Sequence, residues 1–530
     1  MAMMKTIKIV LCSIIIIFLL LLGVEFWLGN KIKVRLEQGV STRTKGAVCL
    51  KIGGARVNLL GRTVKLKRVD VMGDSVLLAK HNIPFYTLKG IIDELTIKGI
   101  HWKKRDTGVV VQTKKLVLKS SSFEITGKTA GKTDEQVFRG KMGEILNALE
   151  IGEINISLED IRYKQWKKRN WTRTTGRNIH VGAEGFTWNV MSGALARMFS
   201  CEALRVSSER VQRELLNGNL VLNVEGLYVG SREGKIKIDS VCLLPLLPKG
   251  KYAIKTGQDW TQVKVSNVTA EQWDFGSLLT ARLLKVGYVG VQDVTVNSFK
   301  NRKIDQPDRV KRLFYEGVQQ FPLGLEVQRI DLLHVHVAYE ELSKSGETPG
   351  KITFNDLSGE FQGLTNVVKA NEPFYKLIVR GKLMNAGEFR TTFRLPVASS
   401  NGRFQIEGEM GEMDLALLNP MITPLTKIEV KSGKVDRMKF RISGDAREAT
   451  TEMEFLYEDF VITLLREKDG RLKKASTLSD IINGVLVRRN NPERDRVRSG
   501  KAVVKRDIYR SQFNYLWHSL FAGIGKIVEG

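Results

Sequence analysis

The segment Val64-Lys65-Leu66-Lys67-Arg68-Val69-Asp70-Val71 carries the pattern that decides the fold. Apolar and polar side chains alternate with a period of two, as in a β-strand that has one apolar and one polar face. The apolar phase shifts after Leu66, and a β-bulge or a tight bend explains such a shift. We therefore predict a mainly β protein. The same alternation recurs at 95–98, 154–158, 235–238, 263–265, 294–296, 374–383, 389–395, 403–406, 438–442 and 452–465.

Helical periodicity is confined to a few stretches. Apolar residues spaced by three or four predict short helices at 140–149, 309–320 and 477–486. A longer amphipathic helix is predicted at 511–528, where Phe513, Leu516, Trp517, Leu520, Ile524 and Ile527 share one face. This last helix either plugs the end of a sheet or lies on a membrane, and its few charges favour plugging.

The first thirty residues predict a membrane anchor. The run from Ile7 to Leu28 is long enough to span a bilayer as a helix. A cleaved signal peptide would have a shorter apolar core and a small-residue cleavage site, which this run lacks. The residues expected to anchor the chain are Ile9, Ile15, Phe18, Leu21 and Trp27, the last at the interface.

The orientation of this anchor does not follow from charge, because lysines and arginines flank both of its ends. An N-terminal helix before a large domain usually acts as a signal anchor. We therefore expect a single-pass inner-membrane protein whose C-terminal body lies in the periplasm.

Composition indicates a folded, strongly basic body. The chain has 530 residues, 42% of them hydrophobic and 27% charged, and its formal net charge is +27. This balance is typical of a folded chain, and the charge favours anionic partners. Cys49, Cys201 and Cys242 are scattered without metal-type spacing, so no disulfide is assigned.

No motif for catalysis, a cofactor or a metal stands out. His334 and His336 alternate on a predicted strand and would share one face. They form either half of a metal site or part of a half-exposed polar face, and no third ligand at useful spacing supports the metal. We therefore predict a protein that is not an enzyme and has no cofactor, with an envelope enzyme of unmarked site as a remaining alternative.

Two basic clusters contain tryptophan, and they are treated together as a candidate patch for anionic headgroups. They comprise Lys103, Lys104 and Arg105 after Trp102, and Lys167, Lys168 and Arg169 between Trp166 and Trp171. Aromatic residues among cations suit single-stranded nucleic acid, an anionic lipid interface or a solvated outer face. A body outside the cytosol meets lipid more often than nucleic acid, so nucleic acid is not expected as a partner.

From about residue 371 onward the chain resembles the C-terminal region of AsmA-like proteins of bacterial envelopes, a family of repeating β-groove proteins that includes the TamB and YhdP relatives. The resemblance rests on Asn385-Ala386-Gly387, Leu418-Asn419-Pro420, Ser432-Gly433-Lys434-Val435-Asp436, Asn490-Asn491-Pro492 and Phe513-Asn514-Tyr515-Leu516-Trp517. The softest boundary in the body is Gly346-Glu347-Thr348-Pro349-Gly350. We therefore expect an anchor at 1–30, an N-terminal β-groove region at 31–345 and an AsmA-like C-terminal β region at 346–530.

The resemblance also implies an elongated, curled antiparallel β-groove with an apolar concave side and a role in outer-membrane lipid homeostasis. One-faced strands with few covering helices agree with it, because they leave apolar surface for a ligand. The expected function is lipid binding or lipid transfer, and the alternative is a non-enzymatic envelope scaffold or assembly factor with protein partners. The residues expected to line the groove are Leu222, Val224, Val263, Val265, Leu377, Val379, Met453, Phe455, Ile462 and Leu464.

Overall fold

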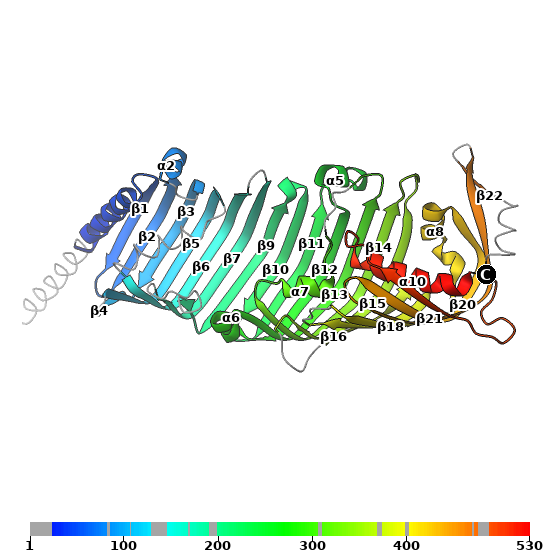
Figure 1. Cartoon of the computed structure of the whole chain (residues 1–530). Coiled ribbons are helices and arrows are strands. Elements are labelled where there is room, and N and C mark those ends of the chain that lie inside the picture. The colour runs from blue at the N-terminus through cyan, green and yellow to red at the C-terminus, as the bar shows by residue number, and fades with distance from the viewer. Residues whose placement is uncertain are drawn as a thin grey trace, which may run out of the picture. The chain divides into compact units, whose positions relative to one another are not determined.

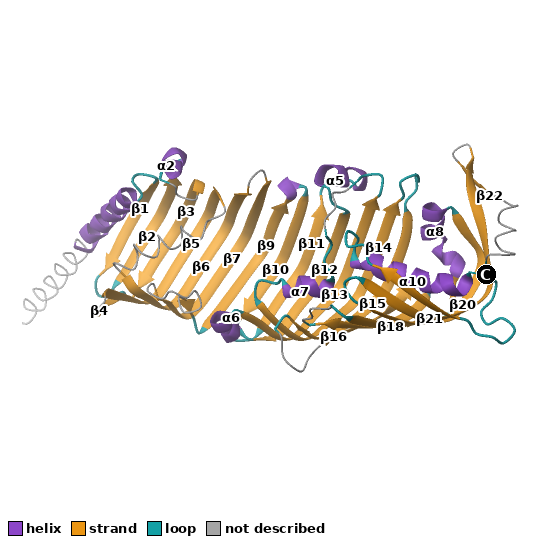
Figure 2. Cartoon of the chain, viewed as in Figure 1, coloured by secondary structure: helices purple, strands orange, loops and turns teal. Residues whose placement is uncertain are grey.

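The computed structural model confirms a mainly β protein: a large, mixed, mostly antiparallel sheet with few short helices (Figures 1 and 2). Contacts divide the chain into an N-terminal unit, Met1–Lys235, and a C-terminal unit, Ile236–Gly530. The expected boundary between 345 and 346 stays a prediction. The structure describes residues 24–81, 85–105, 108–128, 146–167, 170–189, 199–305, 310–367, 374–397, 402–468, 471–474 and 487–529.

The N-terminal unit is a run of strands that pair mostly in chain order. All of the pairs described in this unit are antiparallel except β5–β6, which is parallel. The strands are β1 (Val48–Asn58), β2 (Thr63–Gly73), β3 (Phe85–Lys98), β4 (His101–Arg105), β5 (Gly108–Lys128), β6 (Leu146–Lys167), β7 (Asn170–Asn189), β8 (Phe199–Ser200), β9 (Ala203–Leu215) and β10 (Leu220–Gly230).

The C-terminal unit continues in the same style, with antiparallel pairs and one described parallel pair, β13–β14. Its strands are β11 (Lys235–Pro245), which begins at the last residue of the other unit, β12 (Trp260–Trp273), β13 (Leu283–Asn301), β14 (Gly324–Leu342), β15 (Gly350–Thr365), β16 (Phe374–Leu383), β17 (Gly387–Pro396), β18 (Phe404–Met410), β19 (Met413–Asp414), β20 (Ile428–Gly444), β21 (Glu448–Lys468), β22 (Arg471–Lys474) and β23 (Ser499–Lys505).

The structure confirms some of the predicted helices and corrects others. The C-terminal helix is confirmed as α10 (Gln512–Val528), which Ser511 caps. The helix predicted at 309–320 is shorter in the structure, α7 (Phe314–Gln319). The helix predicted at 140–149 is wrong over residues 146–149, because β6 begins at Leu146. The helix predicted at 477–486 lies outside the described residues. Helices not predicted are α2 (Ser75–Lys80), α5 (Lys249–Thr256), α6 (Phe275–Ala281) and α8 (Asn419–Thr426).

A row of aligned bends crosses the strands of the N-terminal unit. Arg68 on β2 has a φ of 49° and lies opposite Asp93 in a register that continues without a shift. Of the two predicted explanations for the phase shift, a β-bulge or a tight bend, the structure therefore shows a bend at a left-handed residue. Asp93 accepts a hydrogen bond from Ser121 of β5. On β2 the bend lets Leu66 and Val69, three residues apart, both lie buried on the apolar face, and the one-to-one register with β1 and β3 is kept. The row continues through Glu159, Asn178 (φ 48°), Glu209 and Gly226 (φ 63°).

The C-terminal unit has a corresponding row. Asn267, Asp293, His334 and Asp356 have φ values between 49° and 54° and lie on the successive strands β12 to β15. Asp293 and His334 are neighbours in the parallel register, and their side chains approach to 3.2 Å. Asn and Asp tolerate the left-handed region better than most residues, which explains their use at these bends.

Strain at Arg68 gives a first prediction. Its side chain is exposed, so its replacement loses little packing. A β-branched residue is disfavoured at φ 49°, and Arg68→Val should lower the free energy of unfolding by about 1–2 kcal/mol. Arg68→Gly should be neutral or stabilising, because glycine adopts this conformation freely. Urea unfolding of both variants checks this, and equal stabilities would contradict the left-handed conformation at residue 68.

A helix over residues 24–43 protects the edge strand β1, beside which it lies in Figure 1. Glu37 accepts a hydrogen bond from the backbone N–H of Ile52 at 2.7 Å, and Glu25 accepts one from Leu59 at 2.9 Å. Gly29 is buried so close to the Ala55 carbonyl that a Cβ would lie 2.4 Å from its oxygen. The helix therefore provides hydrogen-bond acceptors for backbone N–H groups at an edge that could otherwise pair with another strand.

The core of the C-terminal unit lies beneath α10. Two apolar clusters form there, one around Tyr375, Ile442 and Tyr515 and the other around Phe455 and Ile527. Figures 1 and 2 show α10 over the strands with which it makes contact, β21 and β23. Of the two predicted placements, the structure therefore shows the helix packed on the sheet.

Candidate functional site

The strands of the N-terminal unit share a continuous apolar face. The register places Leu118 of β5, Ile156 of β6, Val181 of β7 and Val206 of β9 side by side, and they point to the same face. Their side chains are half-buried. Other half-buried members of this face are Leu95, Ile97, Leu116, Phe123, Ile125, Ile154, Leu158, Ile161, Val211, Leu222, Val224, Leu227 and Val229.

Among the described residues of this unit, no helix packs across β5 to β10. Helix 24–43 lies at β1, and α2 contacts β3. Figure 2 shows these helices at the margin of the strands. An aliphatic face this wide that remains half-buried differs from an ordinary core, whose side chains are fully enclosed. It is the strongest candidate for a binding surface in the described chain.

The opposite face of the same strands is polar and paired. Lys115 and Glu153 form an ion pair at 2.7 Å, and Lys65 and Glu94 form one at 2.9 Å. Hydrogen bonds from Lys65 and Thr96 lower the pKa of the Glu94 carboxyl. These ion pairs are partly exposed and add little stability, so we interpret this face as the solvated one.

The groove residues predicted on β10 and β12 lie on apolar faces. Leu222 and Val224 are half-buried on the face described above, and Val224 is opposite Val211. Val263 and Val265 are half-buried on β12 of the C-terminal unit, with Val263 opposite Val296.

The groove residues predicted further along the chain approach a closed core. Leu377 and Val379 are half-buried on the same side of β16 as the buried Tyr375. Met453 and Phe455 are 4% and 3% exposed in the cluster that contains Ile527 of α10, so the helix covers them. Ile462 packs at the margin of that cluster, and Leu464 is half-buried opposite Ile428.

Most of the predicted anchor lies outside the described residues, including Ile9, Ile15, Phe18 and Leu21. Trp27 is described and 59% exposed, with the Lys31 ammonium 4.6 Å from its ring centroid. In the part of the chain that the structure covers, no helix is both long and apolar enough to cross a bilayer.

The candidate headgroup patch divides into two places. Lys103 and Lys104 are exposed on β4, beside the start of β5, whereas Lys167 ends β6, beside the end of β5. Strand β5 has 21 residues, so the two clusters are separated by about 60 Å at ~3.3 Å per residue. Lys168, Arg169 and the side chains of Arg105 and Lys167 lie outside the described residues.

The end of the β6–β7 hairpin nevertheless holds an ordered cation–aromatic cluster. The Lys164 ammonium lies 5.0 Å from the Trp166 ring and 4.7 Å from the Trp171 ring, and the Arg173 guanidinium lies 5.4 Å from Trp171. Such contacts suit a polar–apolar boundary, where tryptophan is favoured.

The two histidines have different partners. His334 contacts Asp293, and His336 lies 2.9 Å from the Asn355 side-chain nitrogen. Across the described ranges, no three His, Cys, Asp or Glu side chains converge as metal ligands would. Cys49, Cys201 and Cys242 are free thiols.

The largest part of the apolar face, on β5 to β9, was not among the predicted groove residues. The sequence does carry a signal for this face, because apolar and polar residues alternate in Ile154-Asn155-Ile156-Ser157-Leu158. No family model matches the chain, and no curated protein matches its sequence.

Proposed function

We propose that the protein is a membrane-anchored periplasmic protein of the AsmA-like kind that binds or transfers lipid and contributes to outer-membrane lipid homeostasis. The half-buried apolar face on β5 to β10 carries this proposal. An acyl chain gains about 0.8 kcal/mol for each CH₂ that it buries, so such a face binds lipid tails without specific polar contacts. The curled groove and the inner-membrane anchor expected from the sequence belong to the same proposal.

Lipid that co-purifies with the full chain tests this function. The protein is extracted in mild detergent and its mass is measured under native conditions. We expect several phospholipids per chain, because one acyl chain covers only part of the face. A well-folded chain without lipid above the detergent background would contradict the proposal.

A second candidate is an envelope scaffold or assembly factor for outer-membrane proteins. One observation favours it: α10 already fills the apolar face of β21 and β23 with Tyr515 and Ile527. If the protein's own side chains cover the apolar face along the rest of the chain as well, that face stabilises the fold and does not bind lipid. A folded, lipid-free chain that captures an unfolded outer-membrane protein would support this alternative.

A further inference from the structure

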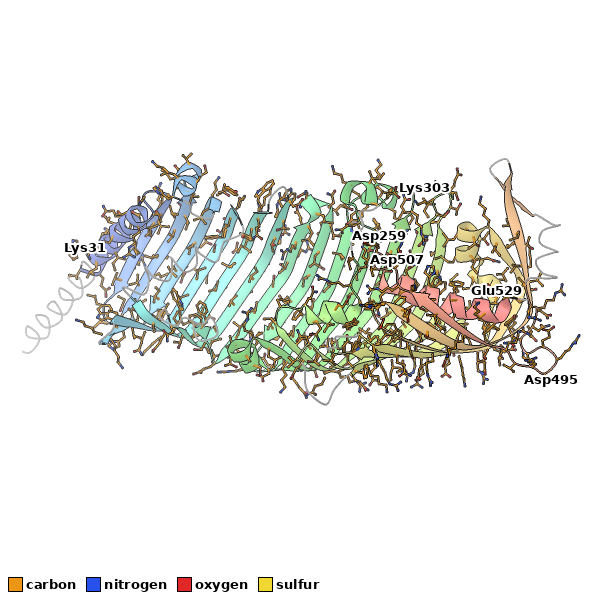
Figure 3. The ribbon with its side chains drawn as sticks, viewed as in Figure 1. Lys31, Asp259, Lys303, Asp495, Asp507 and Glu529 are labelled. Atoms are coloured by element: carbon orange, nitrogen blue, oxygen red, sulfur yellow. The ribbon has the colours of Figure 1, made fainter. Side chains whose placement is uncertain are left out.

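A polar cavity of about 570 Å³ lies in the C-terminal unit, where the ends of β13 and β14 meet the segment that precedes α10. Lys300 and Arg302 border it from β13, and Glu341 from β14. Asp507 and Arg510 border it from the segment before α10. Figure 3 labels Asp259 and Asp507, which line the same cavity from opposite parts of the chain.

Within the described residues, two of the cations that line this cavity, Lys300 and Lys311, form no ion pair. Arg302 pairs with Glu341 at 2.5 Å, Arg510 with Asp507 at 3.4 Å and Lys344 with Asp305 at 3.5 Å. These pairs account for three of the five cations that line the cavity, which are Lys300, Arg302, Lys311, Lys344 and Arg510.

Of the two remaining cations, Lys300 is the one that carries the argument. Its side chain is half-buried, and within the described residues its ammonium forms no ion pair. Burial lowers the pKa of Lys300, while the nearby Asp259 and Glu341 oppose this and the cations Arg510 and Arg302 add to it. An ammonium held in a cavity under these conditions is stabilised by an added anion.

The apolar face of β13 leads directly to this lysine. After the bulge at Asp293, Val294, Val296 and Ser298 alternate on one face, and Lys300 is next on the same face. On β14, Glu341 lies beside Lys300 and Tyr339 lies beside Ser298. Tyr339 packs against Phe513 of α10 with ring centroids 5.9 Å apart.

The Tyr339 hydroxyl donates a hydrogen bond to Glu341, and burial raises the pKa of Tyr339 far above its ordinary value. The tyrosine therefore stays neutral, and Glu341 stays engaged with Tyr339 and Arg302. Lys300 is left as the cation available to a new anion, two residues beyond Ser298 on the face that carries Val294 and Val296.

We propose that this cavity binds the phosphate headgroup of an anionic phospholipid, whose acyl chains lie along the apolar face of β12 to β14. This inference rests on the proposed lipid-binding function and names the class of lipid. Lys300 makes a charge-assisted hydrogen bond to the phosphate, and Arg302 stays fixed by Glu341 at the wall.

The test compares two lipids on the full-length protein. Wild type, Lys300→Met and Lys303→Met are incubated in detergent with equal amounts of phosphatidylglycerol and phosphatidylcholine that carry the same acyl chains. Methionine keeps the apolar stem of lysine without its charge. Lys303 is exposed and does not line the cavity, so it is the matched control (Figure 3). Native mass spectrometry counts each bound lipid, and a parallel titration uses inorganic phosphate.

We expect wild type and Lys303→Met to prefer phosphatidylglycerol by about tenfold and Lys300→Met to lose most of that preference with the total lipid count unchanged. An unchanged preference in Lys300→Met overturns the headgroup site, although bound lipid would still support the wider proposal. Equal binding of both lipids by wild type, with inorganic phosphate bound and lost in Lys300→Met, assigns the cavity to a free anion. Absence of lipid in all three proteins instead overturns the lipid-binding function.

Discussion

Phe455→Ala is expected to lower the free energy of unfolding by about 3–5 kcal/mol, the usual cost of removing an enclosed phenylalanine. The phenyl ring is 3% exposed and lies 5.0 Å from the Tyr457 ring, in the cluster that Ile527 of α10 completes. A cavity left there cannot refill easily, because strands fix one side and a helix fixes the other. Urea unfolding, followed by tryptophan fluorescence, measures the loss.

The matched control is Val503→Ala on β23, whose side chain is 61% exposed and should cost less than about 0.5 kcal/mol. A loss below about 1 kcal/mol for Phe455→Ala would contradict the closed core. It would mean that α10 leaves Phe455 accessible, in agreement with the sequence-based prediction that Phe455 lines the groove.

Ile156→Asp is expected to reduce the lipid that co-purifies with the chain by at least about tenfold. Ile156 lies mid-face between Leu118 and Val181, so a carboxylate there would be in contact with any acyl chain along these strands. Burying that charge without a partner costs more than the contact of a few methylenes returns. Native mass spectrometry of the purified protein gives the lipid count.

Ser157→Asp on the same strand adds the same charge to the opposite face. Ser157 lies 3.1 Å from His180, which can accommodate a carboxylate. This variant should keep its lipid, and circular dichroism should show both variants folded. Equal lipid loss in the two variants would point to general destabilisation and would remove the support for this face.

The alternating sequence predicts much of the fold because period-two patterning is a local property of a strand. The phase shift between Leu66 and Val69 even locates a bend, which Arg68 forms with its positive φ. The amphipathic pattern after Ser511 likewise gives both the helix and its apolar face.

Properties that depend on distant contacts are not predictable in this way. The pattern of Met453 and Phe455 is that of a strand face, but their enclosure depends on α10, more than fifty residues later. The two basic clusters look alike in sequence, yet the direction of β5 places them at opposite ends of one strand. The Lys300 cavity combines strand ends with the segment before α10, and no local motif marks it.

Photo-cross-linking can identify the molecules that touch the apolar face of β6. A benzophenone side chain is introduced at Ile156, and separately at Ser157, in the full chain expressed in its own membrane, and the protein is irradiated before extraction. We predict a lipid adduct at position 156 and none at position 157, since the two side chains point to opposite faces of β6. Adducts to protein alone at position 156, or equal lipid adducts at both positions, would contradict the claim that this apolar face holds lipid.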